Sequence, residues 1–515
     1  MSTGHGGADD QQLGPDSETD ELIDLEEGAG VAAVSAGEER DDLDDGSDTP
    51  YMPDPGTEMS FDAAEAMIVA RGAGRMIPDL DRITLLLELL GQPQRAYPTI
   101  HVTGTNGKGS AVRIVSALLA SAGLSAGTYT SPHLQTIRER LAVSGRRIGE
   151  RAFADLYADV APLAALVDER SADSVTYFEL LTAMASWWFA EVPVDVGVFE
   201  VGMGGTWDAT NLVRGDVCII QPIDIDHAQL GSTPAEIAKE KAGIIKADSM
   251  VVCAAQRSDV MAVLRARCDD IGATLFVAGI DHELLSREPA NGGQVVSVRI
   301  GARTIDSLFI PLLGAHQADN LVVALAAVAA LLGETFDDLT DEAWRQGLLS
   351  ATVPGRLEIV SRSPTVVLDG AHNPHGARAA AAAVRETFDA STPRVLLTGI
   401  LDDKDVDGVL SPWRDVVQHV VVTRVASPRS ASAQRLAIAA NSIWEGTGVT
   451  VERAADLMDA LEIAEGLAGE DGVVIVSGSL MHVGAARDRY LPVLDDDDEI
   501  IYEPDDIDDE EEERR

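Results

Sequence analysis

The chain has 515 residues, 45% of them hydrophobic and 4% aromatic, which predicts two or three domains whose cores are filled mainly by alanine, valine and leucine. Its formal net charge of −47 disfavours nucleic-acid binding. The three cysteines lack metal-ligand spacing, which predicts a reducing compartment without disulfides. The polar start has no signal pattern, and no apolar run is long enough for a bilayer, so we predict a cytoplasmic protein without membrane segments.

The negative charge is concentrated at the two ends. Residues 1–58 contain 18 acidic residues and one arginine, and residues 495–515 contain 14 acidic residues and two arginines. Neither stretch repeats apolar residues at a regular spacing. We therefore predict disordered acidic tails over residues 1–58 and 494–515.

Strands and helices alternate in the first part of the chain. Helices are predicted at residues 61–74, 82–90, 110–122, 151–167, 178–190 and 235–243. Apolar strands are predicted at residues 97–103, 126–130, 194–202, 216–223 and 250–254. This order indicates a doubly wound parallel sheet in a first unit, over residues 59–353.

The sequence Pro354-Gly355 is a turn signal between two folding units. Four apolar strands follow, in TVVLDGAH, RVLLTGI, HVVVTRV and GVVIVSGS, and helical sequence separates them. The second unit is thus predicted to be a smaller, Rossmann-like α/β domain over residues 354–493.

The stretch GTNGKGS has the composition of a phosphate loop but not the usual spacing, which places four residues between the first glycine and Gly-Lys. Gly104, Gly107 and Gly109 allow close approach of the backbone to a ligand, and the helix that follows attracts anions. Lys108 adds a positive charge for phosphates, and Ser110 is predicted to cap the helix or to help hold phosphate or Mg²⁺. A glycine-rich turn that binds nothing is the alternative, which the strand–loop–helix context disfavours.

Other polar residues follow buried strands, where ligands bind in open parallel sheets. Glu200 ends one strand, and a carboxylate there is costly unless it is paired or holds a metal such as Mg²⁺. His227 follows the next strand, but Mg²⁺ rarely takes imidazole, so its chemistry alone favours a core or loop histidine. Lys241 lies beside Glu240, and charge alone favours a solvent-facing lysine.

In the second unit, LDGAHNPHG places Asp369, His372, Asn373 and His375 after a strand. Asp369, together with Arg356 near the Pro-Gly turn, is predicted to face a nucleotide between the domains. A turn rich in helix-capping residues is the alternative.

Together these stretches resemble the folylpolyglutamate synthase/dihydrofolate synthase family of the Mur-ligase-like superfamily. The motifs occur in the family's order over about residues 60–490: GTNGKGS, TSPHL, TYFE, EVGMGGTWDATN, DHAQLG, EKAGI, GAHQADN, PGRLE, LDGAHNP and SGSLMHVG. GTNGK is shared with other Mur ligases, whereas GTNGKGS with TSPHL and LDGAHNP is specific to the folate branch. MIPDLDRI resembles the pterin-binding loop only in part, and the acidic tails lie outside the family pattern.

The resemblance implies that residues 59–353 form a P-loop-type ATPase domain that binds ATP, Mg²⁺ and folate, and that residues 354–493 form a glutamate-ligase domain. It also implies a role for each matching residue. The implied ATP contacts are Thr105, Asn106, Gly107, Lys108, Gly109, Ser110, Asn320, Arg356 and Asp369. The implied Mg²⁺ ligands are Ser131, Glu200 and His227. The implied pteroate-binding residues are Thr176, Tyr177, Phe178, Glu179, Trp207, Asp208 and Ala209. Lys241 matches a lysine that is carbamylated in many members of the family, and His372 matches a histidine near the glutamate site. The predicted catalytic residues are Lys108, Lys241 and His372.

The implied reaction uses ATP and Mg²⁺, with a monovalent cation left open, to join L-glutamate to dihydropteroate, reduced folates or both. ATP converts the substrate carboxylate to an acyl phosphate, and the glutamate amine then displaces phosphate. Lys108 and Mg²⁺ neutralise charge on the transferred phosphoryl group, and closure near Arg356 brings the reactants together. The resemblance also implies a monomer.

Three other functions remain to be weighed. A Mur-type ligase for nucleotide-linked peptides is disfavoured by LDGAHNP and TSPHL. A P-loop kinase or ATPase is disfavoured by the second α/β domain and by the glycine after Lys108. A nucleotide-binding scaffold without activity is disfavoured by the presence of Lys108, Glu200 and His227.

Overall fold

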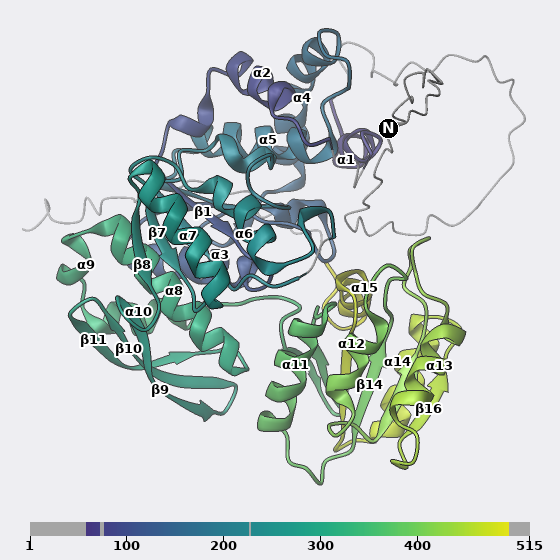
Figure 1. Ribbon diagram of the computed structural model, residues 1–515. Helices are drawn as coiled ribbons and strands as arrows, with labels where there is room; N and C mark the ends of the chain where they lie inside the picture. Colours follow the sequence, from purple (N-terminus) through teal and green to yellow (C-terminus); the bar gives the residue numbers. More distant parts are fainter. Residues whose placement is uncertain (1–57, 73–76, 226–227, 494–515) are drawn as a thin grey trace, which may run out of the picture.

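The structure is a computed structural model that describes residues 58–72, 77–225 and 228–493. The chain has an α/β fold with two sheet-containing units, drawn purple to green and green to yellow in Figure 1. The predicted tails, except Glu58, and His227 lie outside the described residues.

The first unit contains an eight-stranded sheet in the order β4-β3-β2-β5-β1-β6-β7-β8, in which β2, β5, β1, β6, β7 and β8 are parallel. Its strands are β1 (Thr99–Thr103), β2 (Ala126–Tyr129), β3 (Leu141–Val143), β4 (Arg146–Arg147), β5 (Val196–Glu200), β6 (Val217–Ile220), β7 (Met250–Cys253) and β8 (Thr274–Val277). Its helices are α1 (Phe61–Val69), α2 (Asp81–Leu89), α3 (Lys108–Ser121), α4 (Glu150–Asp168), α5 (Tyr177–Glu191), α6 (Pro234–Lys241), α7 (Ser258–Ile271), α8 (Ala315–Leu332), α9 (Thr335–Asp338) and α10 (Asp341–Leu348).

Alternate residues of each central strand enter different cores, because successive side chains point to opposite faces of a sheet. Ile100 and Val102 of β1 pack with α3 and α8, while Cys218 and Ile220 of β6 pack with α6 and α7 on the other face. Helices α1, α2, α4 and α5 form a third cluster over β2 and β5. Both faces of the sheet are therefore covered, which explains why strands such as β6 (VCII) are continuously apolar.

Helix α8 is 18 residues long with a mean hydropathy of 1.5, which by length and composition is enough to cross a membrane. However, 61% of it is buried inside the protein, and it packs against the sheet and α3. Its apolar character is therefore that of a core helix.

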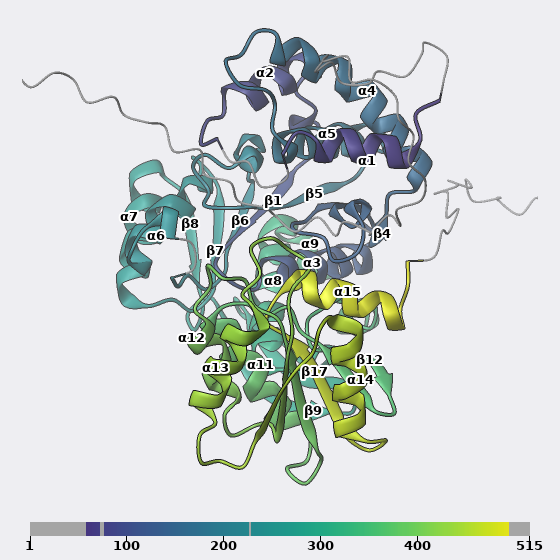
Figure 2. The same cartoon turned by 90° about the vertical axis from the view of Figure 1, so that its right-hand side faces the viewer.

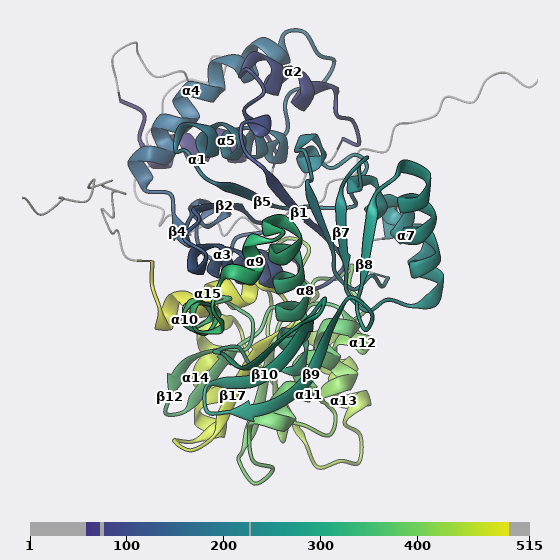
Figure 3. The same cartoon turned by 90° about the vertical axis from the view of Figure 1, so that its left-hand side faces the viewer.

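A three-stranded antiparallel sheet, in the order β11-β10-β9, lies beside α8 and α10 (Figure 3). Its strands are β9 (His282–Ala290), β10 (Gly293–Ile300) and β11 (Arg303–Ile310). The sequence analysis did not predict this sheet. One of its faces is solvated, and the charged residues and proline in HELLSREPA conceal the strand pattern.

The second unit contains a six-stranded sheet in the order β12-β13-β17-β14-β15-β16, parallel except for β12. Its strands are β12 (Glu358–Arg362), β13 (Thr365–Leu368), β14 (Arg394–Thr398), β15 (His419–Val422), β16 (Thr450–Arg453) and β17 (Val473–Ser477). Helices α11 (Pro374–Thr387), α12 (Val406–Leu410) and α13 (Ala433–Ile443) cover one face, and α14 (Leu457–Ala468) and α15 (Leu480–Tyr490) cover the other.

The predicted elements between residues 61 and 254, and the four apolar strands of the second unit, are present, with ends that shift by a few residues. One shift changes an interpretation. Helix α3 begins at Lys108, with Gly107 as its N-cap, so Ser110 lies inside the helix and does not cap it. The prediction of a capping role for Ser110 is wrong.

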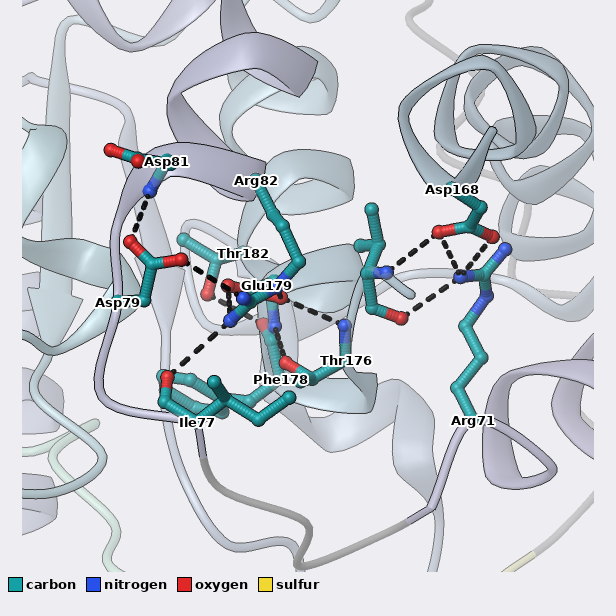
Figure 4. A network of polar contacts seen from close by, with 11 residues as sticks. Arg71, Ile77, Asp79, Asp81, Arg82, Asp168, Thr176, Phe178, Glu179 and Thr182 are labelled. Atoms are coloured by element: carbon teal, nitrogen blue, oxygen red, sulfur yellow. Dashed lines mark hydrogen bonds and ion pairs between the residues drawn. The ribbon is translucent and has the colours of Figure 1, made fainter. Parts of the chain in front are cut away.

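A buried ion pair ties the entrance of α2 to the start of α5 (Figure 4). Arg82 Nη2 lies 3.0 Å from Glu179 Oε1, and both side chains are almost fully buried. Glu179 also accepts a hydrogen bond from the backbone of Thr176 at 2.8 Å, closing a capping box at the start of α5. Arg82 also pairs with Asp79 at 3.0 Å. Glu179 therefore positions the segment that leads into α2.

Replacing Glu179 with alanine leaves the buried Arg82 guanidinium without its main partner. Removing one partner of a buried ion pair costs roughly 3–5 kcal/mol, so we expect a clear loss of melting temperature. The control is Asp259→Ala, which removes an exposed pair with Arg257 and should leave the melting temperature almost unchanged. Equal melting temperatures of the two variants would contradict the structural role of the Arg82–Glu179 pair.

Candidate active site

A cavity of about 930 Å³ lies between the two units, next to the carboxyl ends of strands from both sheets. Four helices begin at its wall: α3, α8, α11 and α15. Each helix N-terminus carries partial positive charge and unpaired backbone N–H groups, so the cavity is suited to a ligand with several negative charges.

Twelve of the predicted site residues line this cavity: Thr105, Asn106, Gly107, Lys108, Gly109, Ser110, Ser131, Glu200, Asn320, Arg356, Asp369 and His372. They come from both units and span about 270 positions of the chain. The fold thus brings together most of the motifs that the sequence analysis identified.

The glycine loop over residues 104–110, the predicted phosphate loop, is packed so tightly that only glycine fits at two positions. Gly107 has a φ of +90°, and a Cβ there would lie 2.7 Å from Asn320 Oδ1. A Cβ on Gly104 would lie 2.5 Å from the Cβ of Gln221. The loop therefore lies directly against the ends of α8 and β6.

Two lysines share one carbonyl oxygen inside this loop. Lys108 Nζ donates to the Gly104 carbonyl at 3.2 Å, and Lys241 Nζ donates to the same oxygen at 3.0 Å. Lys241 is only 4% exposed and is not on the cavity wall. The interpretation of Lys241 as a solvent-facing lysine is wrong, because a charge pattern along the chain does not report burial.

Glu200 lies at the end of β5 and faces the phosphate loop. Its Oε2 accepts a hydrogen bond from the Ser131 backbone at 3.2 Å, and a Cβ on Gly109 would lie 3.4 Å from the same oxygen. Burial raises the pKa of the Glu200 carboxyl, and the nearby Lys108 ammonium opposes this rise. Among the described residues, no group of three or more His, Cys, Asp or Glu side chains surrounds a common point.

Asp369 and Arg356 form the facing wall in the second unit. The Asp369 carboxylate accepts hydrogen bonds from the backbone of Leu357 and of Ala371, both at 3.0 Å. Burial raises the pKa of Asp369, and Arg356 opposes the rise. A Cβ on Gly370 would lie 2.2 Å from Arg356 Nη1, so the guanidinium lies directly over Gly370.

His372 lies beside these residues with a defined ring orientation. Its Nδ1 is 2.9 Å from the Gly370 carbonyl oxygen, which can only accept, so Nδ1 carries the proton. In the neutral ring, Nε2 is then the nitrogen that accepts hydrogen bonds.

The phosphate loop contacts the second unit directly. Asn373 Nδ2 donates to Asn106 Oδ1 at 3.1 Å, and Asn106 Nδ2 donates back to Asn373 Oδ1 at 3.4 Å. Asn106 Nδ2 also lies 3.0 Å from His375 Nδ1. Asn373 caps α11 through the Gly376 backbone at 2.8 Å. The position of the loop is thus linked to the start of α11.

The residues predicted to bind pteroate do not line the cavity. Thr176 and Glu179 form the capping box described above, Tyr177 and Ala209 are buried, and Trp207 is half-buried. Asp208 accepts hydrogen bonds from the backbone of Met203 at 2.9 Å and of Thr210 at 3.0 Å. A Cβ on Gly202, which lines the cavity, would lie 2.7 Å from the Phe178 ring. Their contact with a folate remains a prediction.

The sequence analysis assigned no role to several residues of the wall. The Nε2 atoms of Gln221 and Gln317 are buried without a hydrogen-bond partner, and both residues line the cavity. His316 directly precedes Gln317 and lines the same cavity, and burial lowers its pKa to about 4. Gln317 and His316 belong to the GAHQADN motif, in which only Asn320 received a role. No motif pointed to Gln221, or to Lys404 and Arg429 on the wall of the second unit.

Comparisons with known proteins agree with this geometry. The model of the Mur ligase middle domain matches residues 102–328, and that of the Mur ligase glutamate ligase domain matches residues 355–480. A dihydrofolate synthase/folylpolyglutamate synthase from Mycobacterium tuberculosis is 40% identical over 475 residues, which cover 86% of this chain and 96% of the relative.

Solved structures show the same similarity. The folylpolyglutamate synthase from Mycobacterium tuberculosis complexed with ADP has a TM-score of 0.78 and 40% identity, covering 84% of this chain and 98% of that one. An FPGS–AMPPCP–folate complex has a TM-score of 0.72 and 31% identity, covering 84% of this chain and 100% of that one.

The packing at Gly107 predicts that an alanine there disturbs the phosphate loop. We expect Gly107→Ala to weaken ADP binding at least about tenfold, because its Cβ meets the Asn320 side chain and its backbone is in the left-handed region. The control is Gly91→Ala, which has a similar φ of +79° but no atom within 4 Å of the added Cβ. Isothermal titration calorimetry with ADP measures both, and equal affinities would show that the contact with Asn320 is unimportant.

Proposed function

Because the chain belongs to the dihydrofolate synthase/folylpolyglutamate synthase family of Mur ligases, and is therefore an ATP-dependent ligase, we propose that it joins L-glutamate to the carboxylate of a folate or pteroate. One observation carries the proposal. A single cavity has the phosphate loop and Lys108 on one side and the polar groups of the second unit on the other.

The first step transfers the γ-phosphoryl group of ATP to the substrate carboxylate, which is otherwise a poor electrophile. Lys108 and the N-terminus of α3 offset the charge of the phosphates, a task that depends on groups already fixed in place. Asn320, Arg356 and Asp369 complete the nucleotide site from α8 and the second unit. No covalent nucleophile of the protein is required.

The residues around Glu200 fit a magnesium ion. Mg²⁺ prefers oxygen ligands and is commonly held by one or two carboxylates plus substrate phosphates, which matches the buried Glu200 carboxylate beside Ser131 and the phosphate loop. Glu200 and Ser131 would hold the ion, with His227 as a further predicted ligand. When bound, the ion supplies positive charge to the phosphates of ATP.

The second step needs the amine of L-glutamate beside the acyl phosphate. The amine attacks the carbonyl carbon, the carbon–nitrogen bond forms, and the carbon–oxygen bond to phosphate breaks. Lys404 and Arg429 place positive charge on the wall of the second unit, which is suited to the carboxylates of glutamate, although Arg429 Nη2 also pairs with Asp403 at 2.7 Å. Nε2 of His372, the acceptor nitrogen of the ring, is suited to take the proton that the amine loses.

Both dihydropteroate and reduced folates fit the proposal as acceptors, and the residues of TYFE and TWDA are proposed to hold the pteroate. We also propose that the protein acts as a cytoplasmic monomer, without nucleic acid or membrane. The acidic charge disfavours binding to nucleic acid, and the burial of α8 inside the protein disfavours a membrane span.

The function is tested by ADP release from Mg²⁺-ATP and L-glutamate, with dihydropteroate in one reaction and tetrahydrofolate in the other. We expect release that depends on glutamate with at least one acceptor, and loss of more than about 100-fold in Lys108→Met. Release without glutamate would favour a kinase or ATPase. Activity only with a UDP-linked peptide acceptor would favour the Mur-type alternative.

We propose further that Lys241 is carbamylated. The ammonium groups of Lys108 and Lys241 contact the same oxygen of Gly104, and two like charges this close are unfavourable. Conversion of the Lys241 amine to a carbamate replaces one positive charge by a negative one. The carbamate would add an anionic group beside the loop.

The modification is tested with ¹³C-labelled bicarbonate and NMR. We expect a carbamate carbon signal in the wild type and in Lys239→Met, since Lys239 is exposed on the same helix. The signal should be absent from Lys241→Met. A wild-type protein without this signal at neutral pH would disprove carbamylation.

A further inference from the structure

The loop over residues 131–136, which carries Ser131, packs closely against α15 of the second unit. Figure 2 shows α15 on the side of the second unit that faces the first. A Cβ on Gly484 of α15 would lie only 2.1 Å from the Leu134 carbonyl oxygen. A Cβ on Gly355 would lie 2.9 Å from the Leu134 side chain and 3.1 Å from Val483. Leu134 is thus enclosed between the Pro-Gly turn and α15, and glycine makes both approaches possible.

One guanidinium lies at the centre of this contact. Arg487 of α15 donates to the Glu358 carboxylate from Nε at 3.0 and 3.2 Å and from Nη2 at 3.0 Å. Its Nη1 donates to the side chain of Gln135 in the first unit. Arg487 therefore bonds at the same time to the 131–136 loop and to the start of β12.

Both partners of Arg487 are connected to residues of the cavity. Glu358 accepts a hydrogen bond from the Gly355 backbone at 2.8 Å, and Gly355 directly precedes Arg356. Gln135 is four residues from Ser131, and Glu139 holds its loop through the backbone of Leu134 at 2.9 Å and of Gln135 at 3.0 Å. The segments that carry Ser131 and Arg356 are thus joined through Arg487.

We propose that Arg487 is a positioning residue of the ligation reaction, which sets the placement of the Ser131 loop relative to Arg356 across the boundary between the units. The inference rests on the proposed function for its activity readout. Arg487 does not line the cavity, so it acts through Glu358 and Gln135 rather than on a substrate.

The geometry of arginine is essential to this role. A guanidinium presents several N–H donors in a rigid plane and can hold a carboxylate and an amide at fixed relative positions. A lysine ammonium at the same place keeps the charge but not the fork. Because a misplacement of about 1 Å can cost roughly 100-fold in rate, loss of the fork should act on the chemical step.

The first test compares Arg487→Gln and Arg487→Lys with Arg489→Gln. Arg489 lies on the same helix and pairs with Glu465 of its own unit, at a similar partial exposure. We expect both Arg487 variants to lower kcat for glutamate ligation by about 10- to 100-fold. The KM for ATP and the melting temperature should stay close to those of Arg489→Gln. A kcat equal to that of Arg489→Gln, or a loss of melting temperature that parallels the loss of rate, would overturn the proposal.

The second test does not depend on activity. Spin labels on Ala120→Cys and Glu452→Cys, exposed positions in the first and second unit, report the distance between the units, and the three native cysteines are buried. We expect Arg487→Gln to broaden this distance distribution and Arg489→Gln to leave it unchanged. An unchanged distance distribution in Arg487→Gln would contradict the positioning role, even if the ligase assay failed. A wild-type protein without ligase activity, together with the expected broadening in Arg487→Gln, would refute only the proposed reaction.

Discussion

The site depends on one constraint: the carboxyl edges of two different sheets must face each other. The reciprocal hydrogen bonds between Asn106 and Asn373 join the two units at this place. Each sheet alone presents only one wall. The first unit supplies the phosphate loop and Glu200, and the second supplies Arg356, Asp369 and His372. A ligase that must bring an activated carboxylate to an amine needs both walls in one place, and orientation is the main gain from such an arrangement.

The arrangement of the two walls buries charged groups at the cavity, where they do not favour the stability of the folded protein. The carboxyl groups of Glu200 and Asp369 are buried with raised pKa values, and the Lys241 ammonium is buried behind the loop. Buried charges of this kind are costly unless partners compensate them. For Glu200 and Asp369, backbone donors and the cations Lys108 and Arg356 offset this cost without cancelling it, which is the pattern expected of groups kept for binding and catalysis. The ion pair between Arg82 and Glu179, by contrast, is satisfied on both sides and holds local structure.

The sequence was sufficient to predict the two mainly parallel sheets and the motifs that meet at the cavity. Runs such as VVIVS identify strands buried on both faces, and parallel strands place the residues after them at a common edge. It was not sufficient for features that depend on tertiary packing. The charge pattern around Lys241 concealed its burial, and the solvated face of β9 concealed a whole sheet. Gln221 and Arg487 lie in stretches of sequence without a recognisable motif. Only the packing of other elements gives Arg487 its partner Glu358 and leaves Nε2 of Gln221 without one.

The central claim is that one cavity activates a carboxylate and then joins it to an amine. It is tested most directly with a pteroate or folate acceptor whose reacting carboxylate is labelled with ¹⁸O, incubated with Mg²⁺-ATP and L-glutamate. If an acyl phosphate forms, the carbon–oxygen bond breaks when the amine attacks, and each released phosphate carries one ¹⁸O atom. Phosphate without the label would show that water, and not the carboxylate, receives the phosphoryl group, and would contradict the account.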